Sequence, residues 1–181
     1  MALRDAERGS STPRSHPASE PHTGADRRHT SPIGVGRPVN GQTLERFITL
    51  FRGRGDCYGS WTGGCVKQPL TSGRFAAHLE GKDPIGVYPS LNVDGVARCV
   101  WGCTDIDYAG EEGEHDSASI QAALTHVGVT SWRERTRKGW HVWVFAATLV
   151  TADEMRRTFL AAHQVVDVQP KEVNPKQTVL T

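Results

Sequence analysis

The chain has 181 residues, a formal net charge of +1 at pH 7 and four cysteines. This length suits one globular domain with a tail, and the near-neutral charge excludes a global electrostatic attraction to nucleic acid while leaving local patches open. No apolar run is long enough to span a bilayer, and no apolar segment follows the N-terminal arginines as a secretory signal requires. Four cysteines without an export signal predict free thiols in a reducing compartment.

The N-terminal segment, residues 1–39, is rich in Ser, Pro, Arg, His and Gly and has almost no aliphatic periodicity. Such a segment buries too little apolar surface to offset its ordering entropy, so we predict a disordered tail. Its arginines can contact a phosphate backbone, although a dispensable extension is the simpler interpretation. The folded domain is predicted to cover residues 40–181.

The first half of this domain is predicted to contain two helices and a hairpin. Asn40 is a suitable N-cap for a helix with apolar residues at helical spacing, and a second helix is predicted over residues 71–81. Residues 84–89 are predicted to form a strand that pairs with the next strand. The predicted turn between these strands is Asp94-Gly95, because Asp-Gly is a strong hairpin signal.

The second half alternates helical and strand patterns. We expect an acidic loop over residues 109–114, a helix capped by Asp116 or Ser117, and a strand over residues 129–134. Thr151 has the form of a capping box and predicts a last helix. The mixture of apolar strands and amphipathic helices predicts an α+β fold with a mixed sheet flanked by helices.

The strand over residues 96–107 is apolar for most of its length and ends in two carboxylates. Side chains alternate between the faces of a strand, so Asp105 and Asp107 share a face, with Cβ atoms roughly 6–7 Å apart. Carboxylates at this spacing can converge on one Mg²⁺ or Mn²⁺ ion or straddle a pair of ions. A solvated strand end, where Asp is common, is the alternative.

A basic turn over residues 135–139 leads into a strand that carries His141. Gly139 lets the backbone approach a phosphate, Arg137 and Lys138 supply positive charge, and His141 can donate a hydrogen bond to a triphosphate oxygen. By itself the same pattern is also typical of a core histidine beside a solvated turn. Near the C-terminus, either Glu172 or Asp167 can add a third carboxylate to the pair.

The order of these elements resembles the archaeo-eukaryotic primase superfamily, which has an acidic pair, a histidine element and a third acid. Within it, the chain is most similar to the primase-polymerase domains of TOTE conflict systems and of phages. The resemblance spans about residues 42–181. The matching blocks are residues 50–54, 78–89, 104–107, 135–145 and 172–177.

This resemblance implies a primase-polymerase catalytic core of RRM-like type and assigns roles to residues of this chain. Asp105 and Asp107 are expected to be catalytic metal ligands, together with Glu172 or, as the alternative third acid, Asp167. The remaining expected site residues bind nucleotide. His141 is expected to contact the nucleotide, and Lys138 and Arg137 its triphosphate. Arg52 and Arg54 are expected near nucleotide or template.

The implied function is template-dependent nucleotidyl transfer by a DNA primase or polymerase, with Mg²⁺ or Mn²⁺ as cofactor and a two-metal mechanism. The expected partners are a single-stranded DNA template, nucleoside triphosphates and a helicase, but no membrane. The expected location is the cytoplasm of a bacterial or phage-infected cell. The alternatives are an inactive nucleotide- or nucleic-acid-binding relative and a metal-dependent nuclease.

The chain also departs from the family. Thr136 and Lys138 stand where many relatives have serine or glycine. Relatives continue after the Pro-Lys-Gln block into a further strand, whereas this sequence stops at Thr181. We therefore expect either a domain truncated at its C-terminal end or a closing strand supplied from elsewhere.

Overall fold

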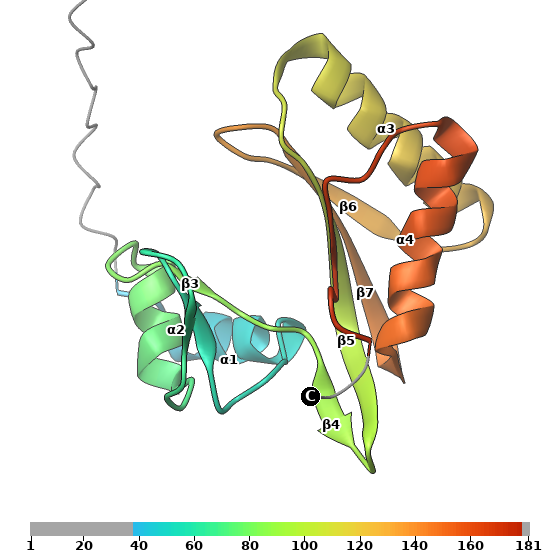
Figure 1. Ribbon diagram of the computed structural model, residues 1–181. Coiled ribbons are helices and arrows are strands. Elements are labelled where there is room, and N and C mark those ends of the chain that lie inside the picture. Colours follow the sequence, from blue (N-terminus) through green and yellow to red (C-terminus); the bar gives the residue numbers. More distant parts are fainter. Residues whose placement is uncertain (1–37, 179–181) are drawn as a thin grey trace, which may run out of the picture. The chain divides into compact units, whose positions relative to one another are not determined.

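The computed structural model describes residues 38–178, so most of the tail predicted over residues 1–39 lies outside the described residues. Within that range, no helix is both long and apolar enough to cross a membrane. Figure 1 shows the elements, which follow one another along the chain as α1 (Gly41–Leu50), β1 (Tyr58–Ser60), β2 (Cys65–Val66), α2 (Ser72–Leu79), β3 (Ile85–Gly86), β4 (Leu91–Val93), β5 (Val96–Ile106), α3 (Gly110–His126), β6 (Ser131–Arg135), β7 (Trp140–Thr151), α4 (Ala152–Val166) and β8 (Glu172–Asn174).

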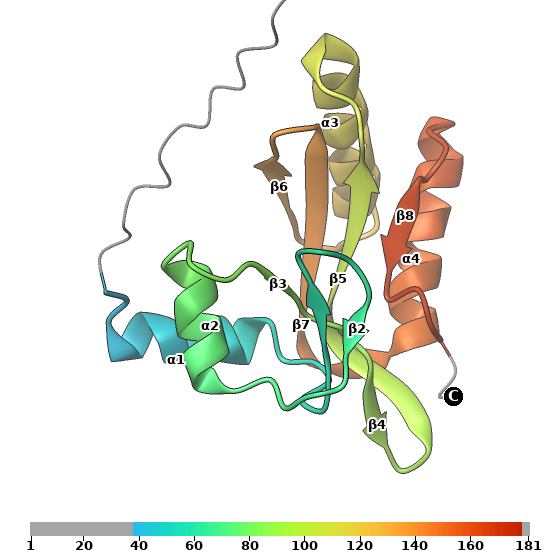
Figure 2. The same ribbon diagram turned by 60° about the vertical axis from the view of Figure 1, so that its left-hand side comes forward.

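The larger sheet has five strands, with β5 at its centre. Strand order is β4-β5-β7-β6, and β8 also pairs with β5. Strand β4 pairs with residues 96–98 of β5, whereas β8 pairs with residues 103–105, so Figure 2 shows β8 beside the acidic end of β5. The α+β prediction is confirmed, but each strand pairing in the described part is antiparallel, where a mixed sheet was expected.

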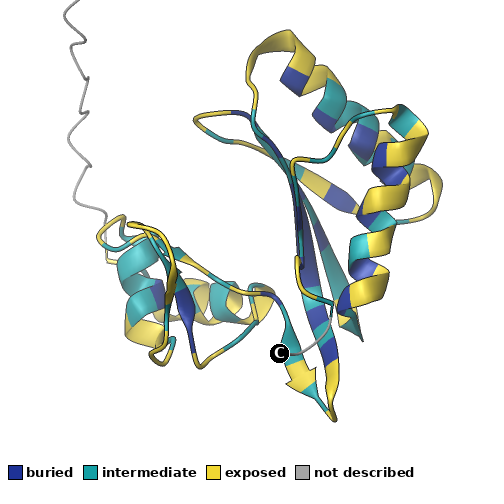
Figure 3. Ribbon diagram, viewed as in Figure 1, coloured by how far each residue is buried: buried dark blue, intermediate teal, exposed yellow. Residues whose placement is uncertain are grey.

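Helices α3 and α4 pack against the larger sheet and form the hydrophobic core with it (Figure 3). Helix α4 turns Met155, Phe159 and Ala162 inward, and Phe159 is fully buried. The predicted capping box is also present, because Thr151 Oγ1 accepts a hydrogen bond from the Glu154 amide at 3.1 Å and the Glu154 carboxylate accepts one from the Thr151 amide at 2.9 Å. Helices α3 and α4 thus cover one face of β5, and the acidic side chains lie on the opposite face.

The N-terminal segment packs on the opposite face through aromatic contacts. Phe51, directly after α1, lies edge-on to three rings of β5 and β7: Trp101, Trp143 and Phe145, at centroid distances of 5.6, 5.4 and 5.5 Å. Trp101 Nε1 also donates a hydrogen bond to the Arg52 carbonyl at 3.0 Å. Aromatic packing of this kind adds about 0.5–1.5 kcal/mol per pair beyond area burial, so it holds α1 near the sheet.

The predicted hairpin has the right turn but a different partner strand. Asp94 and Gly95 have φ values of +52° and +78°, as a type I′ turn requires, and they join β4 to β5. Residues 84–89 were expected to pair with β5, which is wrong: only Ile85–Gly86 form a strand, and it pairs with β1 in the three-stranded sheet. Pro84 and Pro89 flank this strand and lack the amide proton that a longer ladder needs.

Helix α3 begins at Gly110, so the predicted acidic loop over residues 109–114 is wrong and forms the first turns of the helix. Glu111 and Glu112 lie in the first turn, where the helix dipole favours negative charge. The expected cap at Asp116 or Ser117 is wrong for the same reason. Ser117 is instead buried, and its hydroxyl donates to the Glu114 carbonyl at 2.9 Å.

A buried histidine links α4 to the acidic end of β5. His163 Nδ1 lies 2.8 Å from the Val168 carbonyl oxygen, and Nε2 lies 2.7 Å from Thr104 Oγ1. The Thr104 hydroxyl is also 3.1 Å from the Glu172 carbonyl oxygen, so this group supports both β5 and β8. Burial lowers the pKa of His163 below its usual range, and the same cause lowers the pKa of His78.

We expect the free energy of unfolding to fall as the pH is lowered below about 6.5, the ordinary histidine value. The pKa of His163 is depressed in the folded protein, so in this range the unfolded chain binds more protons, and stability falls with pH until the folded pKa is passed. Urea unfolding across this range should show a shallower pH dependence in His163→Gln, with part of the slope left because of His78. His126→Gln, on the exposed side of α3, is the control and should keep the wild-type slope; an unchanged slope in His163→Gln would contradict the assignment.

Candidate active site

Four ionisable side chains form one row across the larger sheet. The antiparallel register places Glu134 of β6 opposite His141 of β7, His141 opposite Asp105 of β5, and Asp105 opposite Glu172 of β8. Directly opposed residues of paired strands project from the same face. The row therefore lies on the face of β5 that does not pack against α3 and α4.

The centre of the row is closely connected. His141 Nε2 lies 3.6 Å from Asp105 Oδ1, and His141 Nδ1 lies 3.1 Å from Glu134 Oε2. The same Glu134 oxygen accepts a hydrogen bond from Trp143 Nε1 at 2.9 Å. The imidazole of His141 is thus held between two carboxylates of neighbouring strands.

The three acids predicted to bind a metal, Asp105, Asp107 and Glu172, differ in their electrostatic environment. Burial raises the pKa of Asp105, and the charges of Asp107 and Glu172 act in the same direction. Asp107, just beyond β5, forms an ion pair with Lys171 that lowers the pKa of this carboxyl. Burial acts to raise the pKa of Glu172, but hydrogen bonds from Lys176 and Asn174 outweigh it, so the net direction is downward.

The donor chemistry of these acids suits a divalent cation, because Mg²⁺ and Mn²⁺ prefer carboxylate oxygens. Among residues 38–178, no three acidic, histidine or cysteine side chains are gathered closely enough to hold an ion. Two of the acids are instead paired with lysines, Asp107 with Lys171 and Glu172 with Lys176, the latter at 2.8 Å. The ligand types therefore fit a metal, and the lysines neutralise the carboxylates in this arrangement.

A cavity of about 520 Å³ lies over the row. Its volume falls in the range of small-molecule sites. It combines the acids of the row with an aromatic wall, so it offers both charge and stacking surfaces to one ligand. The lining residues are Phe47, Phe51, His78, Ile85, Gly86, Val87, Tyr88, Trp101, Cys103, Asp105, Glu134, His141, Trp143, Glu172 and Asn174.

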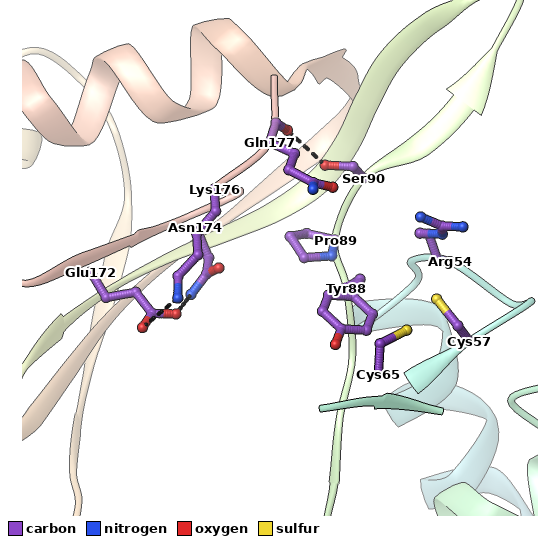
Figure 4. A pocket seen from close by; sticks show the side chains of 10 residues that line it. All are labelled: Arg54, Cys57, Cys65, Tyr88, Pro89, Ser90, Glu172, Asn174, Lys176 and Gln177. Atoms are coloured by element: carbon purple, nitrogen blue, oxygen red, sulfur yellow. Dashed lines mark hydrogen bonds and ion pairs between the residues drawn. The ribbon is translucent and has the colours of Figure 1, made fainter. Parts of the chain in front are cut away.

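A second cavity of about 310 Å³ shares Tyr88, Glu172 and Asn174 with the first. Figure 4 shows Glu172 with Asn174 and Lys176 at one side, and Arg54 with Cys57 and Cys65 at the other. All four cysteines of the chain lie in the described part and are free thiols. The two cavities meet at β8, beside the candidate third acid.

The basic turn lies against the end of β5. Thr136 closes it by donating its amide to the Gly139 carbonyl at 2.8 Å, which leaves Arg137 and Lys138 exposed. The charge of Lys138 is among the causes that lower the pKa of Asp107. Gly139 approaches the backbone of β5, because a Cβ atom there would lie 1.9 Å from the Ile106 carbonyl oxygen.

The other predicted residues lie outside the row. Arg52 is exposed, and its carbonyl accepts the hydrogen bond from Trp101. Arg54 lines the second cavity and pairs with Asp56 at 2.6 Å, and the Asp56 carboxylate raises the pKa of Arg54. Asp167 is the C-cap of α4 with φ +55° and lines a hollow formed by the end of α4 and the residues after it. The structure thus brings Glu172, and not Asp167, beside Asp105.

Several residues of the site were missed by the sequence analysis. Glu134 is two positions from Trp132 on β6, so the period of two predicts that the two side chains share a face, but it does not predict the partner of Glu134 on the next strand. Lys171 and Lys176 flank Glu172 in sequence, yet their ion pairs depend on how β8 docks. His163 has no motif at all, and only its burial beside Thr104 shows its role.

Arg156 connects α4 to the strand that carries Glu172. Its Nη1 atom donates to the Val173 carbonyl at 2.6 Å and lies 3.3 Å from the Pro175 carbonyl oxygen. We expect Arg156→Ala to lower the free energy of unfolding by about 1–3 kcal/mol, because two carbonyls lose a charged donor. Urea denaturation measures this.

The neighbouring residue supplies a matched control for Arg156. Arg157 is mostly exposed, and among the described residues its ion pair is with Asp153, one helical turn away. Arg157→Ala should therefore cost no more than about 0.5 kcal/mol. Equal losses in the two variants would show that the contacts of Arg156 with β8 contribute nothing specific.

Two of three comparisons with known proteins found a similar protein or family. Residues 62–174 match the family model described as TOTE conflict system, archaeo-eukaryotic primase domain. Among solved structures, the polymerase domain of Mycobacterium tuberculosis ligase D in complex with DNA is similar with a TM-score of 0.37 and 13% identity, over 57% of this chain and 43% of that chain. The matched region thus spans less than half of that structure. A search of the curated proteins found no match.

Proposed function

Because the chain belongs to the archaeo-eukaryotic primase domain family of TOTE conflict systems, we propose that it carries out template-dependent nucleotidyl transfer as a DNA primase or polymerase. Residues 40–181 are the proposed catalytic domain. The proposed substrates are nucleoside triphosphates and a single-stranded DNA template.

The observation that carries the proposal is the register of the sheet. It brings Asp105 and Glu172, which are 67 positions apart by their residue numbers, side by side, with His141 on the other side of Asp105. Two carboxylates next to a histidine in a cavity of about 520 Å³ suit a triphosphate and its counterions better than a packing role, which needs no charge.

Asp105, Asp107 and Glu172 are the residues proposed to hold Mg²⁺ or Mn²⁺. When bound, such an ion supplies a positive charge that stabilises the developing charge on the phosphates and activates the attacking 3′-hydroxyl. Lys171 and Lys176, which pair with Asp107 and Glu172, would then be available to contact phosphate oxygens beside these acids.

The other residues are proposed to bind and orient substrates. His141, with Lys138 and Arg137 from the adjacent turn, contacts the triphosphate, which places the α-phosphate in line for attack. Arg52 and Arg54 contact nucleotide or template. Their role is supported by the position of Arg54 in the cavity that adjoins Glu172.

The test is incorporation of labelled nucleotide, with Mg²⁺ or Mn²⁺, on single-stranded and primed templates. Extension or dinucleotide products that disappear in the Asp105→Ala/Asp107→Ala double variant support the proposal. Cleavage of the template instead of extension supports a nuclease. Nucleotide binding by the folded protein without any product supports an inactive binding module, and either result would overturn nucleotidyl transfer.

A further inference from the structure

We propose that Glu134 is a positioning residue for the site: it holds the ring of His141 in one orientation and in one tautomer. The inference rests on the proposed function for its kinetic consequences, but its structural part does not. It starts from two hydrogen bonds that converge on one oxygen atom of Glu134.

An ionised carboxylate can only accept hydrogen bonds. The 3.1 Å contact between His141 Nδ1 and Glu134 Oε2 therefore requires the proton on Nδ1. The other nitrogen, Nε2, points to Asp105 at 3.6 Å, longer than a good hydrogen bond. Glu134 is thus the stronger of the two contacts to the ring, and it leaves Nε2 as the atom that faces the cavity.

Glu134 is itself anchored. The indole Nε1–H of Trp143 donates to the same Oε2 at 2.9 Å, and its ring lies edge-on to the imidazole with a centroid distance of 5.3 Å. Trp143 and His141 are two positions apart on β7, on the same face as Glu134 of β6. The carboxylate is therefore fixed by the tryptophan and cannot follow the histidine if that ring turns.

This arrangement matters most when Asp105 has another partner. When Asp105 binds a cation, its oxygens are no longer directed at His141, and the ring then depends on Glu134 alone. A histidine held through one nitrogen by a carboxylate presents the other in a defined direction, as in other orienting pairs. Glu134 thereby keeps Nε2 directed into the cavity, where it contacts the triphosphate when the ring also carries a proton on this nitrogen.

Glu134 is suited to a direct test because the fold does not depend on it. Its side chain is 56% exposed on the edge strand β6, so its substitution leaves no buried group without a partner except the His141 and Trp143 nitrogens that it contacts. Substitutions at exposed positions of this kind usually change stability by less than about 0.5 kcal/mol.

The first experiment reads the tautomer and needs no activity. Nitrogen-15 NMR at alkaline pH, where histidines are neutral, should show His141 protonated at Nδ1 in the wild type and a mixture of the two tautomers in Glu134→Ala. Trp143→Phe, which keeps a ring but removes the anchoring N–H, should give an intermediate spectrum. A His141 tautomer that is the same in wild type and Glu134→Ala overturns the proposal, whatever the enzyme does.

The second experiment tests whether Glu134 acts through His141. Glu134→Ala should lower kcat/KM for nucleotide incorporation about tenfold, the loss expected for one hydrogen bond to a charged group. In a His141→Ala background the same change should have no effect, because the residue that it positions is gone. Glu45→Gln, an exposed acid of α1, is the control and should match the wild type.

The outcomes separate the two proposals. Additive losses in the Glu134→Ala/His141→Ala double variant would show that Glu134 acts independently of His141 and would overturn the positioning role. No incorporation by any variant, including the wild type, would overturn the proposed function. In that case the NMR result alone decides whether Glu134 sets the orientation of the histidine.

Discussion

Asp105→Asn should reduce nucleotide incorporation by about 10²–10³-fold, the size of loss seen when one electrostatic contributor is removed from an active site. The substitution keeps the shape of the side chain and removes only its charge. Incorporation of labelled nucleotide on a primed template measures the effect, and binding of Mn²⁺, followed by electron paramagnetic resonance, should weaken in parallel.

The same variant should not lose stability, which distinguishes a functional residue from a structural one. Burial raises the pKa of Asp105, and the neighbouring carboxylates add to this, so the folded protein stabilises the charged form less well than water does. A neutral amide avoids this cost. Urea denaturation of Asp105→Asn should therefore give a free energy of unfolding equal to or above the wild-type value.

Two results would contradict this assignment. Full incorporation by Asp105→Asn would remove the residue from the metal site, and a marked loss of stability would show that its charge supports the fold. Asp153→Asn is the control, because Asp153 is an exposed acid that pairs only with Arg157 on α4. It should match the wild type in both measurements.

Gly139→Ala should lower both stability and activity, although it adds only a single methyl group to the basic turn. The added Cβ would lie 1.9 Å from the Ile106 carbonyl oxygen and 2.8 Å from the Tyr108 amide nitrogen. Both atoms belong to backbone, so the turn before β7 and the end of β5 have to separate. Overpacking of this kind costs about 1–3 kcal/mol, and the shift would move Asp107, which lies between Ile106 and Tyr108.

Urea denaturation and nucleotide incorporation check this prediction together. Gly55→Ala is the matched control, since a Cβ at Gly55 meets nothing within 4 Å and its backbone has no positive φ. We expect the control to keep wild-type activity and stability within about 1 kcal/mol. If Gly139→Ala behaved like Gly55→Ala, the close approach of the turn to β5 would not matter for the site.

The local elements near the site were predictable because their signals are short-range. Alternation along β5 separates Asp105 from its buried neighbours Thr104 and Ile106, and Asp94-Gly95 gives the positive φ values of a tight hairpin. The capping box at Thr151 starts α4 where it was expected. Each of these features depends on residues at most a few positions apart, so the sequence by itself determined them.

Element limits were less predictable where two local signals compete. Residues 109–114 look like an acidic loop, yet the helix dipole stabilises Glu111 and Glu112 in the first turn of α3. Residues 84–89 look like a strand for the larger sheet. The two prolines shorten that strand, and Gly86 fits against Gly59 of β1, where a Cβ would lie 3.5 Å from the Gly59 Cα atom.

The sequence by itself thus determined an acidic strand end, a basic turn with a histidine strand, and an α+β pattern. Only the tertiary structure decided that Glu172 lies beside Asp105 while Asp167 caps α4, and that Glu134 holds His141. Shifting a strand by one residue turns every side chain to the other face, and the register of β8 on β5 is set by distant contacts such as Arg156 with Val173. Those contacts join residues that no local pattern connects, and the site exists only once they have formed.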